Sequence, residues 1–236
     1  MLISPTPEDM KLRPGDIVMS DFDGTITLKD TGWVVFDTLE LEEAWDWEYR
    51  WRDREIGSME CLRGQWGLVN LPPDELLALV DDIELDEHFP EFVMRAREAG
   101  AEVVVASDGL SFYLDRMLER LGFEICDDDP EPGVLRDCVT RYVNTAILTE
   151  DGVHIEFPHS NPACLQCGNC KQSHLSRLRL KYRRAIYIGD GYSDRCPAMT
   201  ADIVFAKGHL AKLFDEDGLP YVPFESFDDI IAATVE

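Results

Sequence analysis

Two carboxylates, Asp21 and Asp23, are the residues of this 236-residue chain whose spacing most directly indicates chemistry. They follow an apolar run of strand character and precede Gly24 and Thr25. Like charges this close together raise one pKa unless a cation lies between them, so the pair predicts a divalent metal ion. Oxygen ligands favour Mg²⁺. An acidic turn after a strand, without function, is the alternative.

Two later segments repeat this arrangement of an apolar run followed by small and polar residues. Residues 101–106 are followed by Ser107-Asp108-Gly109, where a hydroxyl and backbone N–H groups would form a niche of phosphate size. Residues 185–188 are followed by Gly189-Asp190-Gly191 and, three residues on, by Asp194. Two carboxylates four residues apart at a strand end again suit metal coordination.

Lys171 is the fourth candidate, because it opens a segment with helical character that runs to about Lys181. The dipole of a helix favours negative charge at its N-terminus, so a lysine there is locally unfavourable. A bound anion beside Lys171 would remove that conflict. The position therefore predicts a ligand site rather than a surface lysine.

The elements that must position these residues alternate between strands and helices through most of the chain. This order predicts an α/β fold, with a mostly parallel, Rossmann-like sheet and helices on both faces. Ligands bind such sheets at the carboxyl ends of the strands, where all four candidates lie. Residues 141–148 and 153–157 break the alternation and predict a β-hairpin.

Residues from Asp30 to about Ile83 have amphipathic helical character and contain no candidate strand. We therefore expect a small all-helical cap domain at 30–85, inserted after the first strand, and a core domain made of 1–29 and 86–236. All five tryptophans fall inside this insert. They either fill the core of a small bundle or form an aromatic lid over a substrate.

Charge and cysteine content narrow the class of protein. The formal net charge of −25 argues against nucleic-acid binding, and no apolar stretch approaches the length of a membrane span. A phosphate site in so acidic a chain needs local positive charge, which a metal ion and Lys171 would supply. The N-terminal residues do not match a signal peptide, and the seven cysteines do not indicate an extracellular disulfide framework, so we expect a cytoplasmic protein.

Three of the cysteines, Cys164, Cys167 and Cys170, lie close together in the sequence, with His159 nearby. Three thiolates and a histidine could close a structural Zn²⁺ site. The alternative is a set of thiols that pack a tight loop ahead of Lys171. We expect the packed loop, because the spacing does not guarantee a fourth ligand.

The ordered set Asp21-x-Asp23-Gly-Thr, Ser107, Lys171 and Gly-Asp190-x-x-x-Asp194 resembles the haloacid dehalogenase superfamily of aspartyl-nucleophile phosphatases. The helical insert after the first motif is similar to that of its phosphoserine-phosphatase-like subgroup, subfamily IB. The resemblance implies a Mg²⁺-dependent phosphatase that acts on a small phosphorylated metabolite. A non-catalytic ligand-binding protein on the same fold is the alternative from another class.

A closer likeness joins the chain to the methionine-salvage 2-hydroxy-3-keto-5-methylthiopentenyl-1-phosphate phosphatases. It rests on Phe157-Pro158-His159-Ser160, Cys167-Gly168-x-Cys170-Lys171 and Phe205-Ala206-Lys207. The chain departs from that family in having Ser107-Asp108-Gly109 rather than Ser-Gly-Gly, and its last motif also differs. At those points it is more similar to the phosphoethanolamine/phosphocholine phosphatases. A phosphoserine-type substrate is a further alternative.

The resemblance implies a role for each candidate residue. Asp21 would be the nucleophile that forms an aspartyl phosphate, and Asp23 would be the general acid and base. The remaining roles are metal binding by Asp21, the Asp23 carbonyl and Asp190, orientation of the metal shell by Asp194, phosphate binding by Gly24, Ser107, Gly109 and Lys171, and substrate selectivity by Asp108. The carboxylate of Asp108 would repel a second anionic group of the substrate and attract a cation.

Overall fold

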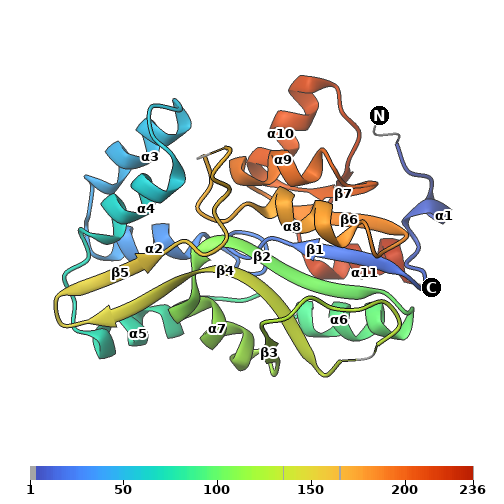
Figure 1. Ribbon diagram of the computed structural model, residues 1–236, viewed down its shortest axis with the longest axis horizontal. Coiled ribbons are helices and arrows are strands. Elements are labelled where there is room, and N and C mark those ends of the chain that lie inside the picture. The colour runs from blue at the N-terminus through green and yellow to red at the C-terminus, as the bar shows by residue number, and fades with distance from the viewer. Residues whose placement is uncertain (1–3, 135, 165, 236) are drawn as a thin grey trace.

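The computed structural model describes residues 4–134, 136–164 and 166–235, and an eight-stranded sheet runs through it (Figure 1). The strand order is β3-β4-β2-β1-β6-β7-β8, all neighbours are parallel, and β5 pairs with β4 in antiparallel fashion. The strands are β1 (Asp16–Ser20), β2 (Glu102–Leu110), β3 (Glu124–Cys126), β4 (Cys138–Thr149), β5 (Gly152–Glu156), β6 (Arg184–Gly189), β7 (Ile203–Ala206) and β8 (Val222–Pro223). The predicted parallel α/β sheet is therefore confirmed.

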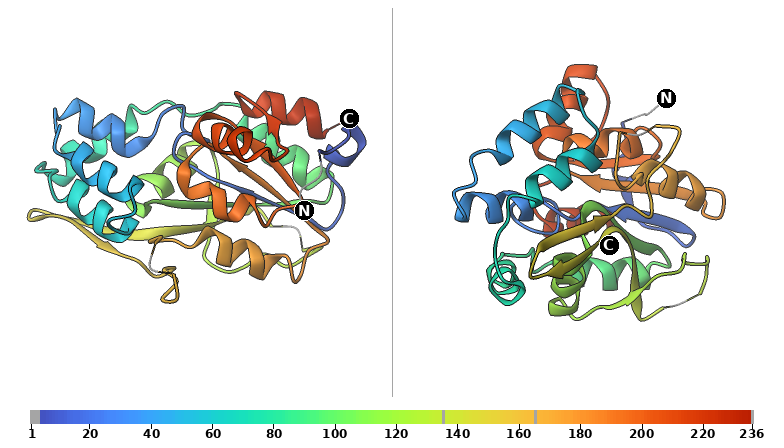
Figure 2. Two further views of the ribbon diagram at one scale, coloured as in Figure 1. Left: turned by 90° about the horizontal axis from the view of Figure 1, so that it is seen from above. Right: turned by 60° about the vertical axis from the view of Figure 1, so that its left-hand side comes forward.

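Helices cover both faces of the sheet, as Figures 1 and 2 show. One face packs against α6 (Phe89–Glu98), α7 (Ser111–Arg120) and α11 (Phe227–Thr234), and the other against α8 (Lys171–Leu178), α9 (Arg195–Ala198) and α10 (Gly208–Asp217). Successive side chains of a strand point to opposite faces, so Val18 belongs to the first core and Ile17 and Met19 to the second. Both faces are apolar because both are buried. A short helix, α1 (Pro7–Met10), precedes β1.

Four consecutive helices follow β1 before the chain returns to the sheet, and we call them the helical insert. They are α2 (Thr31–Thr38), α3 (Ala44–Arg52), α4 (Ser58–Trp66) and α5 (Pro73–Asp81). They lie beside one end of the sheet, at the left of Figure 1. The two ends of the insert meet in an isolated bridge between Thr27 and Leu85, with Asp86 N 2.8 Å from Ile26 O. The division into a cap at 30–85 and a core stays a prediction.

The hairpin predicted between residues 141 and 157 is present as β4 and β5. The predicted end of the second core strand is different. Residues Ser107, Asp108 and Gly109 lie within β2, where the register against β4 shifts between Ala106 and Leu110. Asn144 of β4 explains the shift, because its Nδ2 donates to the carbonyl and carboxylate oxygens of Asp108 in place of a regular ladder.

Cys126 and Cys138 form a disulfide that joins β3 to β4, and the other five cysteines are free. A disulfide framework consists of several bridges that stabilise a small domain in place of a hydrophobic core. The single bridge seen here, between adjacent strands of a well-packed sheet, is not such a framework. Within the described ranges, no helix combines the length and apolar character that crossing a membrane would require.

Candidate active site

The four candidate segments meet at the carboxyl end of the sheet. Asp21 follows β1, Ser107 lies in β2, Asp190 follows β6, and Lys171 is the first residue of α8. Strand β1 has β2 on one side and β6 on the other: the chain continues from β1 to β2, and α8 later returns it to the other side of β1 as β6. Open α/β sheets form a crevice at such a point, which is why residues from distant segments gather here.

Lys171 connects two of the carboxylates. Its Nζ lies 2.5 Å from Asp21 Oδ1 and 2.6 Å from Asp194 Oδ1, and the side chains of Lys171 and Asp21 are only 2% and 6% exposed. Burial opposes the charge on Lys171, but the two carboxylates outweigh it, so the pKa of Lys171 lies above its usual value. The conflict between a lysine and a helix N-terminus is thus resolved by carboxylates of the protein itself.

Asp194 is fully hydrogen-bonded. Its Oδ1 accepts from Lys171 and from the hydroxyl of Tyr187 at 2.7 Å, and its Oδ2 accepts from the N–H groups of Asp190 and Gly191 at 3.0 and 2.9 Å. Both carboxylate oxygens therefore have partners from the protein. A residue held in this way can fix the positions of its neighbours. The orientation of a metal shell by Asp194 stays a prediction.

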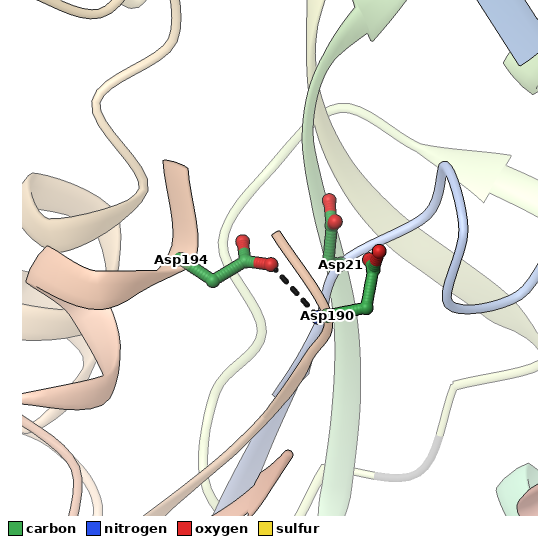
Figure 3. A group of neighbouring side chains, drawn as sticks. All are labelled: Asp21, Asp190 and Asp194. Carbon is green, nitrogen blue, oxygen red and sulfur yellow. Dashed lines mark hydrogen bonds between the residues drawn. The ribbon is translucent and has the colours of Figure 1, made fainter. Parts of the chain in front are cut away.

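Asp21, Asp190 and Asp194 form the one group of three potential metal-ligating side chains found among the described residues. Their nearest ligand atoms lie within 4.8 Å of one another, and Figure 3 shows Asp21 and Asp190 at adjoining strand ends, with Asp194 on a helical turn beside them. Burial and the charge of Asp194 raise the pKa of Asp21 despite Lys171, and they raise that of Asp190 to about 6. A hard divalent cation fits these oxygen donors and would lower both pKa values.

The approach of Asp190 to the first motif explains two of its residues. Thr25 Oγ1 donates to Asp190 Oδ1 at 2.9 Å. Gly24 has a φ of +80°, and a Cβ added to it would lie 2.6 Å from Asp190 Oδ2. Only glycine allows both this backbone conformation and this close contact.

The side chain of Asp23 lies outside the metal-ligating group and faces β2 and α7. Its Oδ2 accepts hydrogen bonds from Tyr113 Oη at 2.9 Å and Ser107 Oγ at 3.1 Å. Burial raises the pKa of Asp23, although these donors oppose the shift. Sequence reasoning missed Tyr113, which is separated from Asp23 by 90 positions and carries no motif of its own.

The backbone N–H groups expected to bind phosphate are arranged differently from the prediction. The N–H of Gly24 donates to Thr27 Oγ1 at 2.8 Å, and the N–H of Gly109 donates to Ser107 Oγ at 2.9 Å. Both N–H groups thus stabilise the local backbone that carries them. Lys171 and the Ser107 hydroxyl are the predicted phosphate ligands whose donors point into the site.

Asp108 lines the cavity described below and also anchors the loop before Lys171. Its Oδ1 accepts from the N–H of Asn169 at 2.7 Å and from Asn144 Nδ2 at 3.1 Å. The selectivity role predicted for Asp108 stays a prediction. Its structural role was not expected from the sequence.

Asn169 is a second residue that sequence reasoning missed. It is buried, and its Nδ2 donates to the carbonyl oxygens of Ser107 and Tyr142 at 2.8 and 2.7 Å. Its Oδ1 lies 2.8 Å from His174 Nε2, so that nitrogen must carry the proton. Burial and nearby positive charge lower the pKa of His174 to about 3, so its ring is neutral. Asn169 therefore joins β2, β4 and α8 behind Lys171.

A cavity of about 380 Å³ extends from these residues toward the helical insert. Its apolar wall contains four of the five tryptophans, Trp33, Trp45, Trp51 and Trp66. The rings of Trp33 and Trp45 stack at 3.7 Å. Trp66 is also fully buried in the core, as expected of a tryptophan that fills a small bundle. The aromatic lid over a substrate stays a prediction.

Charged residues line the same cavity. Glu48 and Arg52 of α3 form an ion pair at 2.7 Å, and Arg52 also lies over the ring of Tyr192 at 5.0 Å. The cavity can therefore contact polar and apolar groups of a ligand.

The three cysteines ahead of Lys171 differ in burial. Cys170 is buried and Cys164 is exposed, and Ser173 Oγ lies 3.0 Å from Cys170 Sγ. No group of three metal-ligating side chains that includes these cysteines occurs in residues 4–134, 136–164 and 166–235. The choice between a zinc site and packed thiols stays a prediction.

The chain is similar to known proteins at the level of family and of sequence. The model of the haloacid dehalogenase-like hydrolase family matches residues 18–198. The chain is 28% identical over 219 residues to proteins named 2-hydroxy-3-keto-5-methylthiopentenyl-1-phosphate phosphatase from Bacillus cereus and Bacillus mycoides. In each case the match covers 91% of this chain and 94% of the relative.

Solved structures share the fold. A phospho-aspartyl intermediate analogue of phosphoserine phosphatase has a TM-score of 0.68 at 16% identity, covering 95% of this chain and 100% of that one. A haloacid dehalogenase family hydrolase from Salmonella enterica serovar Typhi has a TM-score of 0.72 at 16% identity, covering 100% of this chain and 75% of that one. At these identities the likeness concerns the fold alone.

Proposed function

Because the chain belongs to the haloacid dehalogenase-like hydrolase family, we propose that it hydrolyses a small phosphate monoester through an aspartyl phosphate on Asp21. The observation that carries this proposal is the contact of Asp21 with Lys171 at 2.5 Å, beside Asp190 and Asp194. Lys171 opposes the rise in the pKa of this buried carboxylate, and a divalent cation bound beside it would complete the ionisation that a nucleophile requires. An enzyme, unlike a ligand-binding protein on the same fold, needs every catalytic residue. The residues predicted for catalysis are all present in this chain.

The reaction has two steps. In the first, Asp21 Oδ attacks phosphorus, the bond from phosphorus to the ester oxygen breaks, and Asp23 donates its proton to that oxygen, so that an alcohol leaves. In the second, Asp23 accepts a proton from water, which attacks the aspartyl phosphate and releases inorganic phosphate and the free carboxylate. Each step thereby uses Asp23 in one of its two protonation states.

Charge stabilisation is the main contribution expected of the remaining residues, because the transferred group spreads negative charge over its oxygens. Lys171 and the Ser107 hydroxyl would bind those oxygens. Asp21 and Asp190 would hold Mg²⁺ with the Asp23 carbonyl, and Asp194 would keep Asp190 and Lys171 in place. The bound ion supplies positive charge that offsets the repulsion between the carboxylates and the phosphate.

For the substrate we propose 2-hydroxy-3-keto-5-methylthiopentenyl-1-phosphate, an intermediate of methionine salvage. Support comes from the curated relatives over 91% of the chain and from the aromatic wall of the cavity. A thioether is polarizable and makes favourable contacts with aromatic rings such as Trp33 and Trp66.

A second candidate is favoured by the acidic residues of the cavity. Asp108 and Glu48 line it together with the tryptophans, and carboxylates with aromatic rings attract an ammonium group. Phosphoethanolamine or phosphocholine is therefore the alternative substrate, with phosphoserine as a further one. A non-catalytic ligand-binding role is the remaining alternative.

The experiment that tests the proposal is a hydrolysis screen of phosphorylated metabolites in the presence of Mg²⁺, followed by kinetics on the enol phosphate, phosphoethanolamine, phosphocholine and phosphoserine. We expect the highest kcat/KM on the enol phosphate. Preference for an ammonium-bearing ester would support the alternative. Absence of turnover on every ester, with binding retained, would favour the non-catalytic role. The cytoplasmic location expected from the sequence stays a prediction.

A further inference from the structure

We propose that Tyr113 is a positioning residue for proton transfer by Asp23. Its hydroxyl holds Asp23 Oδ2 so that Oδ1 carries the proton delivered to the leaving group. The inference rests on the proposed function, because it presupposes that Asp23 protonates the departing oxygen. It assigns to the reaction a residue from α7, outside all the motifs identified in the sequence.

The hydrogen bonds around Asp23 are asymmetric. Oδ2 accepts from Tyr113 Oη at 2.9 Å and from Ser107 Oγ at 3.1 Å, whereas Oδ1 has the N–H of Thr31 at 3.4 Å. A carboxyl oxygen that accepts two O–H donors is a poor place for a proton. The protonated form of Asp23 therefore carries its hydrogen on Oδ1.

The directions of the two hydroxyl hydrogens follow from their other contacts. Ser107 Oγ accepts the N–H of Gly109 at 2.9 Å, so its hydrogen is free to point at Asp23. A phenol hydroxyl is protonated at neutral pH, and Tyr113 therefore acts as a donor to the ionised form of Asp23 as well. Both donors can thus be present before and after the proton has left Asp23.

Ser107 has a second proposed role that Tyr113 does not share. If the Ser107 hydroxyl turns to a phosphate oxygen of the substrate, Tyr113 is the remaining O–H donor on Asp23 Oδ2. The orientation of the carboxyl group during the reaction would then depend on Tyr113. Loss of its hydroxyl would let the proton-bearing oxygen turn away from the leaving group.

The phenol ring is held on several sides. Tyr113 is 2% exposed, and its ring lies nearly parallel to that of Trp66, with a centroid distance of 6.0 Å and an angle of 24°. Trp66 belongs to α4 of the helical insert, whereas Tyr113 belongs to α7. A Cβ on Gly109 would lie 2.1 Å from Tyr113 Oη, so a side chain at that position would displace the hydroxyl. This packing gives Tyr113 the rigidity that a positioning residue needs.

The test compares two esters with different leaving groups in the variant Tyr113→Phe. In 4-nitrophenyl phosphate the leaving group departs without a proton, whereas the alkoxide of benzyl phosphate requires one. We expect kcat/KM for benzyl phosphate to fall about tenfold more than that for 4-nitrophenyl phosphate, which corresponds to the loss of one hydrogen bond in the transition state. The ratio of the kcat/KM values for the two esters, measured on one preparation, does not depend on the fraction of folded protein.

Two further variants complete the series. Tyr182→Phe removes another buried tyrosine hydroxyl, in the core beneath α8, and we expect it to leave the ratio unchanged. Asp23→Asn removes the acid itself and should lower turnover of benzyl phosphate preferentially and more strongly than Tyr113→Phe does. An equal loss on both esters in Tyr113→Phe, or no loss, would overturn the inference while leaving the proposed function intact.

Failure of the proposed function has a different signature. If Asp23→Asn affects both esters equally, Asp23 does not protonate the leaving group, and the premise of the inference fails. If the unmodified protein hydrolyses neither ester, nor any phosphorylated metabolite of the screen, both proposals are overturned together.

Discussion

Lys171 Nζ lies 2.5 Å from Asp21 Oδ1, although 150 positions separate the two residues in the chain. The lysine begins α8, and the aspartate follows β1 at the centre of the sheet. The contact brings a buried positive charge to the residue proposed as nucleophile. It also explains how three carboxylates can lie close together in a protein of formal net charge −25.

The first prediction concerns the nucleophile. We expect Asp21→Asn to lower kcat by about 10⁴-fold or more, because the amide cannot attack phosphorus. The variant should stay folded, since Lys171 keeps its contact with Asp194 at 2.6 Å. Steady-state kinetics on the best substrate of the screen and a thermal melt check both parts. Turnover within tenfold of the unmodified protein would exclude Asp21 as the nucleophile.

The second prediction concerns the metal ion. Chelation should abolish hydrolysis, and Mg²⁺ should restore it and raise Tm, because a ligand that binds the folded state stabilises it. Asp190→Asn should weaken the Mg²⁺-dependent rise of Tm, since it removes one of the proposed ligands. Exposed Asp217, which pairs with Arg195 at 2.6 Å, offers a control in Asp217→Asn. Full activity in excess chelator would remove Mg²⁺ from the proposal.

The third prediction concerns pH and His174, whose pKa is lowered to about 3 by burial first and then by positive charge nearby. An unfolded chain binds a proton at this residue near pH 6.5, whereas the folded protein does not, so stability falls as the pH drops from about 6.5 toward 3. Between pH 6.5 and 5 the loss attributable to His174 should be about 2 kcal/mol. Above about pH 7.5 the residue contributes almost no pH dependence.

Denaturant unfolding of the unmodified protein and of His174→Gln at several pH values measures this contribution. Glutamine can donate to Asn169 Oδ1 but does not titrate. The difference in free energy of unfolding between the two proteins should therefore change with pH only below about 7.5. Parallel curves from pH 7 to 5 would show that His174 is not held neutral by the fold.

The fourth prediction separates the two roles of Asp108. Asp108→Asn retains an oxygen that can accept from Asn169 and Asn144 but removes the charge, whereas Asp108→Gly removes both. If the carboxylate sets selectivity, Asp108→Asn should lower kcat/KM for phosphoethanolamine about fivefold relative to the enol phosphate, a change of about 1 kcal/mol expected of a partly screened charge. Asp108→Gly should in addition lower kcat on both substrates, because it frees the loop before Lys171. Unchanged preference in Asp108→Asn would leave Asp108 with its anchoring role alone.

The sequence by itself determined the architecture and most of the residues in the crevice. Apolar runs that end in Asp21 and Asp190 predict buried parallel strands, and such strands must bring their carboxyl ends to one edge of a sheet. Lys171 could be identified because its position at a helix start conflicts with the helix dipole. Each of these inferences depends on local pattern, which a single sequence contains.

The tertiary structure alone decided which groups pair within the crevice. Tyr113 and Asn169 carry no pattern of their own, and their roles arise from the packing of α7 against β2 and from the contacts of Asn169 with β2 and β4. The N–H groups of Gly24 and Gly109, expected to bind phosphate, are satisfied by Thr27 and Ser107. Hydrogen bonds act over about 3 Å, so their partners are set by the final placement of segments that are distant in the sequence.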